Sequence, residues 1–297
     1  MDLRQLEIFA KVAEHGSFSR AAEALFLTQP TVSEHIRTLE DELGTRLLDR
    51  LGRGAAVTRA GQLLLSYAQR MLALQREARQ AIENFQGRLS GELIVAGSTI
   101  PGEYVLPALI GRFREKYPDI LTILLIGDTQ AVVEWVASGR AELGVAGGRP
   151  AHRGIDYKEL MPDELVVVVA PSHPWMGRKE VTIPELAAEP VLLRERGSGS
   201  RAALEGALGE AGLALTGLSI VGEMGSTQAI KQAVKAGVGV SLVSRRAVEE
   251  EWRLGLVGCL RVKGLTVTRA FVLVSHRDRS RSPLAEAFRL FVEAEAV

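Results

Sequence analysis

Four short runs of glycine, serine and threonine carry the donors in this 297-residue sequence that could hold a small ligand. They are Gly97–Ile100, Gly127–Gln130, Arg196–Arg201 and Gly225–Thr227, and each joins an apolar stretch to a stretch with helical spacing. Where a strand leads into a helix, the first backbone N–H groups of the helix can bind an anion. Serine and threonine are also the common helix N-caps, so each run taken singly has an ordinary structural explanation.

The run "RERGSGSRAALEGAL" makes the most specific prediction. Gly197 and Gly199 permit tight or positive-φ conformations that turn successive N–H groups inward as an anion nest. Ser198 and Ser200 add hydroxyls, and Arg201 either adds a full charge or points outward as a first-turn residue. With almost no aromatic residue nearby, we expect a small anion such as sulfate, sulfite, phosphate or a small carboxylate. The further predicted effector-binding residues are Ser98, Thr99, Ile100, Thr129, Ser226 and Thr227.

The same run also fits the Gly-x-Gly-x-x-Gly/Ala fingerprint of dinucleotide sites, and Glu223 follows at a suitable distance. An NAD-dependent enzyme is therefore an alternative. Two features weigh against it. "RER" separates the apolar run from the first glycine, and the five histidines are scattered without a catalytic partner. We expect no catalytic residues, no metal site and no catalytic cofactor.

Apolar strands and helices alternate from residue 92 onward, which predicts a parallel sheet with helices on its faces. "ELIVAG", "ILTILLIG" and "AELGVAG" form a first group of strands, and "ELVVVVAP" begins a second α/β run. Two lobes joined by two crossing strands would give a sensor domain resembling a periplasmic binding protein. The candidate ligand-binding runs then lie at strand ends, facing the cleft between the lobes.

Residues 27–44, "LTQPTVSEHIRTLEDELG", predict a helix with an unusual surface. Val32, Ile36 and Leu39 recur at helical spacing, and Pro30 suits the first turn of a helix. Two shorter helices before it, the second capped by Ser17, give helix-turn-helix geometry, in which this third helix enters the DNA major groove. The predicted base-contacting residues are Gln29, Thr31, Ser33, His35, Arg37 and Thr38, and Ser17 is a further DNA-binding candidate.

The residues after Gly44 predict a two-stranded wing whose tip carries Arg50 and Arg53, suited to phosphate or minor-groove contacts. The first 58 residues hold 7 Lys and Arg against 9 Asp and Glu, so DNA contacts must come from placed groups and not from a basic field. A small helical bundle with a polar face explains the same spacing. Glu34 in the middle of that face counts against a simple basic reading surface.

From residue 60 to 85 apolar residues recur in steps of four and three, the heptad spacing of a coiled coil. A long helix packed on its own domain is the alternative, although its apolar stripe would be wider. We favour a dimerisation helix, since one reading helix alone gives weak specificity. The predicted seam contains Leu64, Tyr67, Met71, Leu74 and Phe85.

The stretch "FAKVAEHGSFSRAAEALFLTQPTVSEHIRTLEDELGTRLLDR", followed by "VTRAGQLLL", resembles the winged helix-turn-helix of LysR-type transcriptional regulators. The resemblance implies a winged helix-turn-helix domain (1–58), a linker helix (59–88) and an effector-binding domain (92–297). Lobe I of that domain would hold residues 92–164 and 268–297, and lobe II residues 165–267. The expected function is a ligand-responsive regulator of promoters, bound to an interrupted AT-rich dyad of double-stranded DNA.

The family also implies self-association as a dimer and a tetramer, with RNA polymerase as a further candidate partner. The stretch "GEMGSTQAIKQAVKAGVGVSLVS" resembles the branch that senses sulfur or carbon-fixation metabolites. A DNA-binding protein that needs no signal is a third reading, but it leaves about two hundred residues without a role.

Composition limits the cellular setting. There is no run of about 18 apolar residues, so we expect no membrane span. The N-terminus reads as a charged amphipathic helix and not as a signal peptide. The lone Cys259 cannot form a disulfide within the chain, which suits a reducing cytoplasm.

Overall fold

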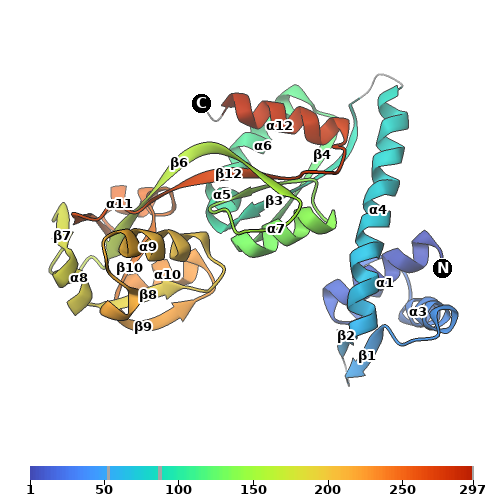
Figure 1. The fold of residues 1–297 in the computed structure, drawn as a ribbon, viewed down its shortest axis with the longest axis horizontal. Coiled ribbons are helices and arrows are strands. Elements are labelled where there is room, and N and C mark those ends of the chain that lie inside the picture. Colours follow the sequence, from blue (N-terminus) through green and yellow to red (C-terminus); the bar gives the residue numbers. More distant parts are fainter. Residues whose placement is uncertain (52–53, 86–88, 296–297) are drawn as a thin grey trace. The chain divides into compact units, whose positions relative to one another are not determined.

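The computed structural model describes residues 1–51, 54–85 and 89–295 (Figure 1). Residue contacts divide the chain into two compact units, Met1–Arg88 with Ser138–Arg140, and Leu89–Ala137 with Ala141–Val297. Within the described residues, no helix combines the length and apolarity needed to cross a membrane.

The N-terminal unit begins with three helices, α1 (Leu3–His15), α2 (Phe18–Ala24) and α3 (Gln29–Leu43). Local capping sets their ends: the Asp2, Ser17 and Thr28 side chains accept bonds from first-turn N–H groups, and Gly16 and Gly44 end α1 and α3 in the left-handed conformation. Their inward faces form one core that includes Phe9, Val32, Ile36 and Leu39.

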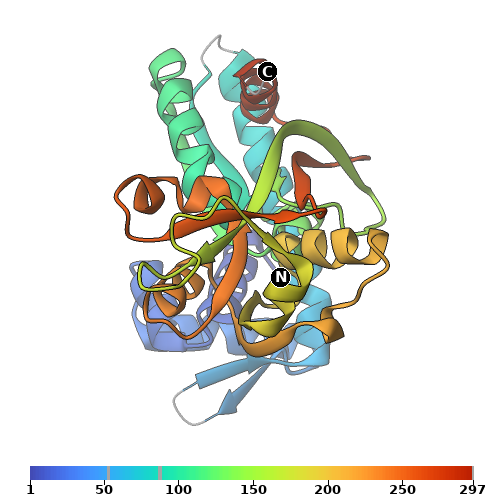
Figure 2. The ribbon, with the colours of Figure 1, turned by 90° about the vertical axis from the view of Figure 1, so that its left-hand side faces the viewer.

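A two-stranded ribbon and a long helix complete this unit. Strands β1 (Leu48–Leu51) and β2 (Gly54–Val57) pair antiparallel and project from the helices as the light blue arrows of Figure 2. The 27-residue helix α4 (Arg59–Phe85) follows directly. The predicted order of two short helices, a third helix, a wing and a linker helix is therefore present.

The C-terminal unit contains one continuous ten-stranded sheet with the order β4-β3-β5-β12-β6-β10-β8-β9. Strand β11 branches from β6, and β7 pairs with β11. Strand β3 pairs parallel with β4 and β5, and β8 pairs parallel with β9 and β10, as expected of alternating strands and helices. The strands are β3 (Gly91–Ser98), β4 (Ile120–Gly127), β5 (Leu143–Ala146), β6 (Ile155–Val169), β7 (Glu180–Thr182), β8 (Pro190–Arg194), β9 (Ser219–Met224), β10 (Val240–Ser244), β11 (Gly258–Lys263) and β12 (Thr268–His276).

Eight helices of this unit lie among the described residues: α5 (Thr99–Tyr104), α6 (Leu106–Lys116), α7 (Thr129–Ser138), α8 (Ile183–Ala188), α9 (Gly199–Glu210), α10 (Thr227–Lys235), α11 (Glu249–Arg253) and α12 (Pro283–Glu295). Short 3₁₀ turns lie at η1 (Leu215–Gly217) and η2 (Arg245–Ala247). Each half of the C-terminal unit has its own hydrophobic core. One core lies around Phe113, Phe271 and Phe288, and the other around Val167, Leu193 and Leu204.

Two antiparallel strands, β6 and β12, join these halves. Residues 155–164 of β6 pair with β12, and residues 165–169 pair with β10 or β11 instead. Figure 1 shows β6 in yellow-green and β12 in red running side by side between the two halves. We call the half with β3, β4, β5, α5, α6, α7 and α12 lobe I, and the half with β7 to β11 and α8 to α11 lobe II. The α/β fold with two lobes and crossing strands is as predicted.

Candidate functional site

Helix α3 buries Val32, Ile36 and Leu39, so its remaining sides face away from its own domain. Gln29, Ser33 and Arg37 follow one another at four-residue spacing, and the Gln29 amide donates to the Ser33 hydroxyl at 2.8 Å. At 3.6 residues per turn, Thr31, His35 and Thr38 lie on the other side of the buried stripe. The helix therefore carries the six predicted residues in two groups, with Glu34 and Arg37 exposed on its outer face.

The other DNA-binding candidates have different surroundings. The Ser17 hydroxyl accepts the Arg20 N–H at 3.4 Å, which makes Ser17 the N-cap of α2. Arg50 lies in β1 opposite Ala55, and Arg53 falls outside the described residues. Arg37 is the freest predicted donor on α3, since its side chain is 82% exposed and only a loose 3.7 Å pair joins it to Asp41.

The predicted seam of α4 divides into residues that pack on their own domain and residues that do not. Leu64 lies against the helix-turn-helix core together with Ala60 and Leu65. Tyr67 and Leu74 are exposed, as are Leu63 and Ile82 on the same helix. Met71 is half-buried, and the Phe85 side chain lies outside the description. The exposed apolar residues of α4 are thus Leu63, Tyr67, Leu74 and Ile82, and they overlap the predicted seam at Tyr67 and Leu74.

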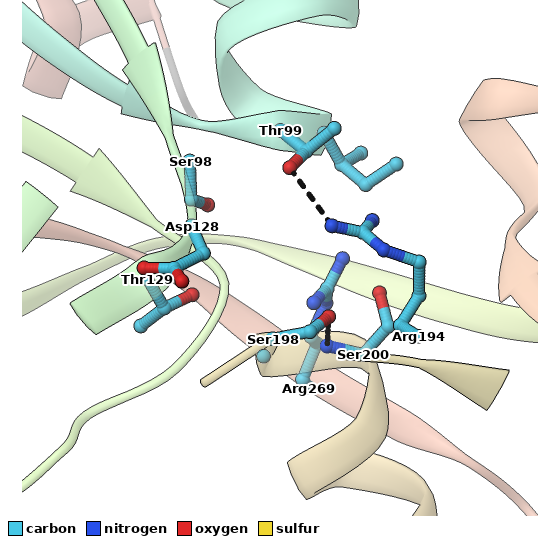
Figure 3. A pocket seen from close by; sticks show the side chains of 10 residues that line it. Ser98, Thr99, Asp128, Thr129, Arg194, Ser198, Ser200 and Arg269 are labelled. Carbon is cyan, nitrogen blue, oxygen red and sulfur yellow. Dashed lines mark hydrogen bonds between the residues drawn. The ribbon is translucent and has the colours of Figure 1, made fainter. Parts of the chain in front are cut away.

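A polar pocket lies between lobe I and lobe II of the C-terminal unit (Figure 3). Seven of the ten predicted effector-binding residues line it: Ser98, Thr99, Ile100, Thr129, Ser198, Gly199 and Ser200. Asp128, Arg194 and Arg269 complete the lining, which contains no aromatic side chain. The empty space is about 200 Å³, part of it open to solvent. The fold therefore brings strand ends from both lobes to one small site.

Arg194, at the end of β8 in lobe II, spans the pocket. Its Nη2 donates to the Thr99 hydroxyl of lobe I at 3.2 Å, and its Nη1 donates to the Thr227 hydroxyl at 2.6 Å. Glu195 accepts from Nε and Nη2 at 2.7 and 2.6 Å, so the charge of this buried guanidinium is matched by its neighbour. Arg194 thereby links the lobes while holding little unpaired charge.

The two glycines of the nest play different parts. Gly197 has a φ of +94°, the left-handed region that favours glycine. Gly199 begins α9 and lies against lobe I, where an added Cβ would fall 2.3 Å from the Gly147 carbonyl oxygen. The Ser198 hydroxyl accepts the Ser200 N–H at 3.3 Å, the helix-capping role that we gave as the ordinary explanation.

Arg201 does not line the pocket. Its guanidinium pairs with Glu205 at 2.9 Å and with Glu223 at 2.6 Å, and these hydrogen bonds raise the pKa of Arg201 and lower that of Glu223. Glu205 lies one turn further along α9 and Glu223 lies in β9, and the Arg201 side chain is only 13% exposed. Arg201 is therefore held in ion pairs, directed neither into the pocket lining nor out to solvent. Ser226 and Thr227 also lie outside the lining: Ser226 caps α10 through the Ala229 N–H, and Thr227 supports Arg194.

Sequence reasoning missed Asp128, Arg194 and Arg269. A signal was present for the two arginines, because each interrupts or ends an otherwise apolar strand, "VLLR" and "TRAFVLVS". A charged group buried in such a strand is costly unless it is paired or used. Asp128 was hidden by its ordinary role, since its carboxylate caps α7 by accepting the Ala131 N–H at 2.7 Å.

Family comparisons match both units. Residues 3–62 match the family described as "Bacterial regulatory helix-turn-helix protein, lysR family". Residues 86–296, more than half of the chain, match the "LysR substrate binding domain". The chain belongs to the LysR family. It is accordingly a DNA-binding transcriptional regulator whose C-terminal domain makes it ligand-responsive.

Two curated transcriptional regulators resemble the whole chain. The "RuBisCO operon transcriptional regulator" of Allochromatium vinosum is 35% identical over 298 residues, covering 100% of this chain and 97% of that protein. The "HTH-type transcriptional activator CmpR" of Synechocystis sp. is 34% identical over 297 residues, covering 99% and 96%. The sequence predicted a resemblance to the branch that senses sulfur or carbon-fixation metabolites, and the relatives named as RuBisCO regulators bear out the carbon-fixation alternative.

Solved LysR structures share the fold. The full-length regulator CbnR matches with a TM-score of 0.75 and 25% identity over 100% of both chains, and its complex with target DNA with 0.73, 26% and the same coverage. The regulatory domain of CcmR from Synechocystis PCC6803, solved with 2-PG, matches with a TM-score of 0.63 and 25% identity. That match covers 70% of this chain and 98% of the CcmR chain.

Proposed function

We propose that this LysR regulator responds to a small oxyanion bound in the pocket between lobe I and lobe II. The observation that carries the proposal is the lining itself, where serine and threonine residues at the starts of α5, α7 and α9 lie around the side chains of Arg194 and Arg269. The one carboxylate of the lining, Asp128, is engaged as the cap of α7. Donors of this kind, held in a buried site, bind carboxylate, sulfate or phosphate oxygens. The absence of an aromatic side chain among the lining residues supports a ligand without a ring.

The relatives and structural neighbours indicate which compounds to test first. The 2-PG of the CcmR regulatory domain makes 2-PG the first compound to test. The names of the relatives support carbon-fixation genes as the regulated set.

We propose that DNA is read by α3 and held by the wing. The exposed Arg37 and the row that it shares with Gln29 and Ser33 support base contacts, and the antiparallel ribbon supports backbone contacts by Arg50. The residue ranges 1–58, 59–88 and 92–297 are proposed as the functional divisions. The exposed apolar residues of α4 support a dimer through this helix, while a tetramer and a contact with RNA polymerase stay predictions from the family.

We propose that this regulator is not also an NAD-dependent enzyme. A dinucleotide site needs a free acidic side chain for the ribose, but Glu223 is paired with Arg201 at 2.6 Å. The tight contact of Gly199 with the Gly147 carbonyl leaves no room for a pyrophosphate at that point of the turn. We propose the cytoplasm as the site of action, because the DNA partner lies there.

Calorimetry of the full-length protein tests the effector class. We expect binding of sulfate, phosphate, acetate or 2-PG and none of glycerol or benzyl alcohol. Ser198→Ala and Thr99→Ala should weaken oxyanion binding, and Thr182→Ala, which removes a cap from α8 far from the pocket, should not. Tight binding of benzyl alcohol with no oxyanion bound would refute the proposal.

A further inference from the structure

Arg269 is a buried arginine at the point where the crossing strands meet. It lies on β12 directly opposite Asp163 of β6, and its Nε donates to Asp163 Oδ2 at 2.9 Å. The Arg269 side chain is 8% exposed and the Asp163 side chain 0%. Ser244 of lobe II donates its hydroxyl to the other carboxylate oxygen at 2.6 Å. The pair therefore ties together the two strands that join the lobes.

The guanidinium of Arg269 is fixed on a second side by lobe I. Its Nη1 donates to the Gly147 carbonyl oxygen at 3.4 Å. A Cβ added to Gly147 would fall 2.5 Å from Nη1, so the backbone and the guanidinium lie in close contact. Its Cζ also lies 5.2 Å from the centre of the Phe271 ring. These contacts leave the guanidinium little freedom to move.

The third nitrogen of the Arg269 guanidinium has no acceptor in the described part of the chain. Its Nη2 is buried and has no hydrogen-bond partner among the residues that the structure describes. Figure 3 shows the guanidinium entering the pocket between Ser198 and Arg194. A buried charged donor without an acceptor costs more than a neutral one, so such a group in a native protein calls for an explanation.

The electrostatic surroundings of Arg269 also favour binding of an anion. Burial lowers the pKa of Arg269 and the nearby Arg194 lowers it further, while Asp163 opposes both. Arg194 forms an ion pair with Glu195, and its other hydrogen bonds go to the hydroxyls of Thr99 and Thr227. An anion in the pocket would stabilise the charged form of Arg269, and none of its described neighbours does this through Nη2.

We propose that the anionic group of the effector accepts a hydrogen bond from Arg269 Nη2, and that the Arg269–Asp163 pair transmits this binding to the crossing strands. This rests on the proposed oxyanion site and names the residue that couples it to the lobes. The bound anion shares the guanidinium with Asp163, which weakens the hold of β12 on β6 and changes the relative stability of lobe arrangements. Only such a difference in affinity between arrangements can alter DNA binding.

The decisive variant of the full-length protein is Arg269→Gln with Asp163→Asn, because it removes both charges and leaves neither one buried alone. The matched control is Arg277→Gln with Asp156→Asn, an exposed pair joined at 2.9 Å between the end of β12 and β6. Arg269→Lys provides a second variant that keeps the charge and the chance to pair with Asp163 but loses the forked donor. The probes are sulfate, inorganic phosphate and 2-PG, and their binding is measured by calorimetry after a thermal melt has checked folding.

We expect the Arg269 variants to bind the oxyanions about ten-fold or more weakly, since hydrogen bonds to charged groups are the strong ones. The control should bind as the wild type does. Asp163→Asn alone should bind the anion more tightly, because Arg269 is no longer shared, yet its operator affinity should respond less to the anion.

The outcomes separate three failures. If the wild type binds none of the oxyanions, the proposed effector site is refuted and this inference with it. If the wild type binds and the folded Arg269 variants bind equally well, the site stands and Arg269 is no part of it. If Asp163→Asn changes its operator affinity with the anion as fully as the wild type does, Arg269 binds the anion but the pair does not transmit it.

Discussion

The carbonyl oxygen of Gly147 lies 2.3 Å from the position that a Cβ would take on Gly199. Gly147 follows β5 in lobe I, and Gly199 begins α9 in lobe II. The Thr129 hydroxyl would also lie within 2.9 Å of that Cβ. A backbone carbonyl cannot swing aside as the end of a long side chain can. The lobes can therefore meet in this way only while residue 199 is glycine.

Gly199→Ala should hold the lobes apart and weaken oxyanion binding by about ten-fold or more, roughly the 1–3 kcal/mol of a forced core overpacking. Gly206→Ala, in the same helix with open space around the added methyl, is the control and should raise stability by up to about 1 kcal/mol. Calorimetry and thermal melts measure both. Normal oxyanion binding by Gly199→Ala would show that lobe contact is not needed.

Arg37→Ala or Thr31→Ala should weaken operator binding by roughly 1–3 kcal/mol if the side chain contacts a base edge. Arg50→Ala should weaken operator and unrelated DNA alike and lower the salt slope by about one. Arg253→Ala, an exposed arginine of the effector domain, controls for net charge. Gel-shift titrations at several salt concentrations measure the DNA affinities and the salt slope. Wild-type affinities for all three variants would remove α3 and the wing from the interface.

Tyr67→Glu combined with Leu74→Glu should split the dimer, because both side chains are more than half exposed in the single chain and would meet like charges across a two-fold seam. Leu64 is unsuitable for this test, since it supports the helix-turn-helix core. Gln62→Glu with Ser66→Glu adds two charges to other exposed positions of α4 and should leave the dimer intact. A dimer that persists in light scattering would place the contact elsewhere.

Lys231→Met should destabilise the effector domain at neutral pH by about 2 kcal/mol, the scale of a hydrogen bond to a charged group. The buried Lys231 donates to Glu251 at 2.6 Å, to the Ala247 carbonyl at 2.9 Å and to Tyr104 at 3.2 Å. Burial tends to lower the pKa of Lys231, but the bonds to Glu251 and Tyr104 raise it overall, and the bond from Lys231 lowers the pKa of Glu251 against burial.

The pH dependence follows from these directions. The depressed Glu251 pKa gives stability that is present above its unfolded value and lost as the pH falls through the folded one. The raised Lys231 pKa gives stability that is present below its unfolded value and lost in strong alkali. Denaturation from pH 3 to 8 should therefore show the wild type and Lys231→Met converging at the acid end. A constant difference would mean that Glu251 is not the partner that matters.

Phe26→Asn should stabilise the N-terminal unit by up to about 1 kcal/mol, because Phe26 has a φ of +55° and asparagine tolerates the left-handed region. The ring is 96% exposed, so its removal loses almost no buried surface. Phe26→Ala should bring no such gain, since alanine keeps the backbone penalty. Thermal melts compare the three proteins. A lower melting temperature for Phe26→Asn would mean that the ring has a packing role.

Features set by neighbouring residues were determined by the sequence. The ends of α3 are set by Thr28 and Pro30 at its start and by Gly44 at its end, because capping and φ preferences act within one helical turn. The alternation of strands and helices placed Ser98, Thr129 and Ser198 at element junctions, where the structure has them. The family followed from the same stretches of sequence.

Only the tertiary structure decided which junctions meet. The register of β12 on β6 sets Arg269 opposite Asp163 and aims it into the pocket, and pairing across 106 residues of sequence leaves no local signal. Arg201 could not be assigned because its direction depends on Glu223, which β9 brings beside α9. Leu64 fits a heptad seam by its spacing, but it packs against the core of its own domain together with the rest of that side of α4. Short-range backbone preferences thus fixed the elements, and long-range register and packing fixed the site.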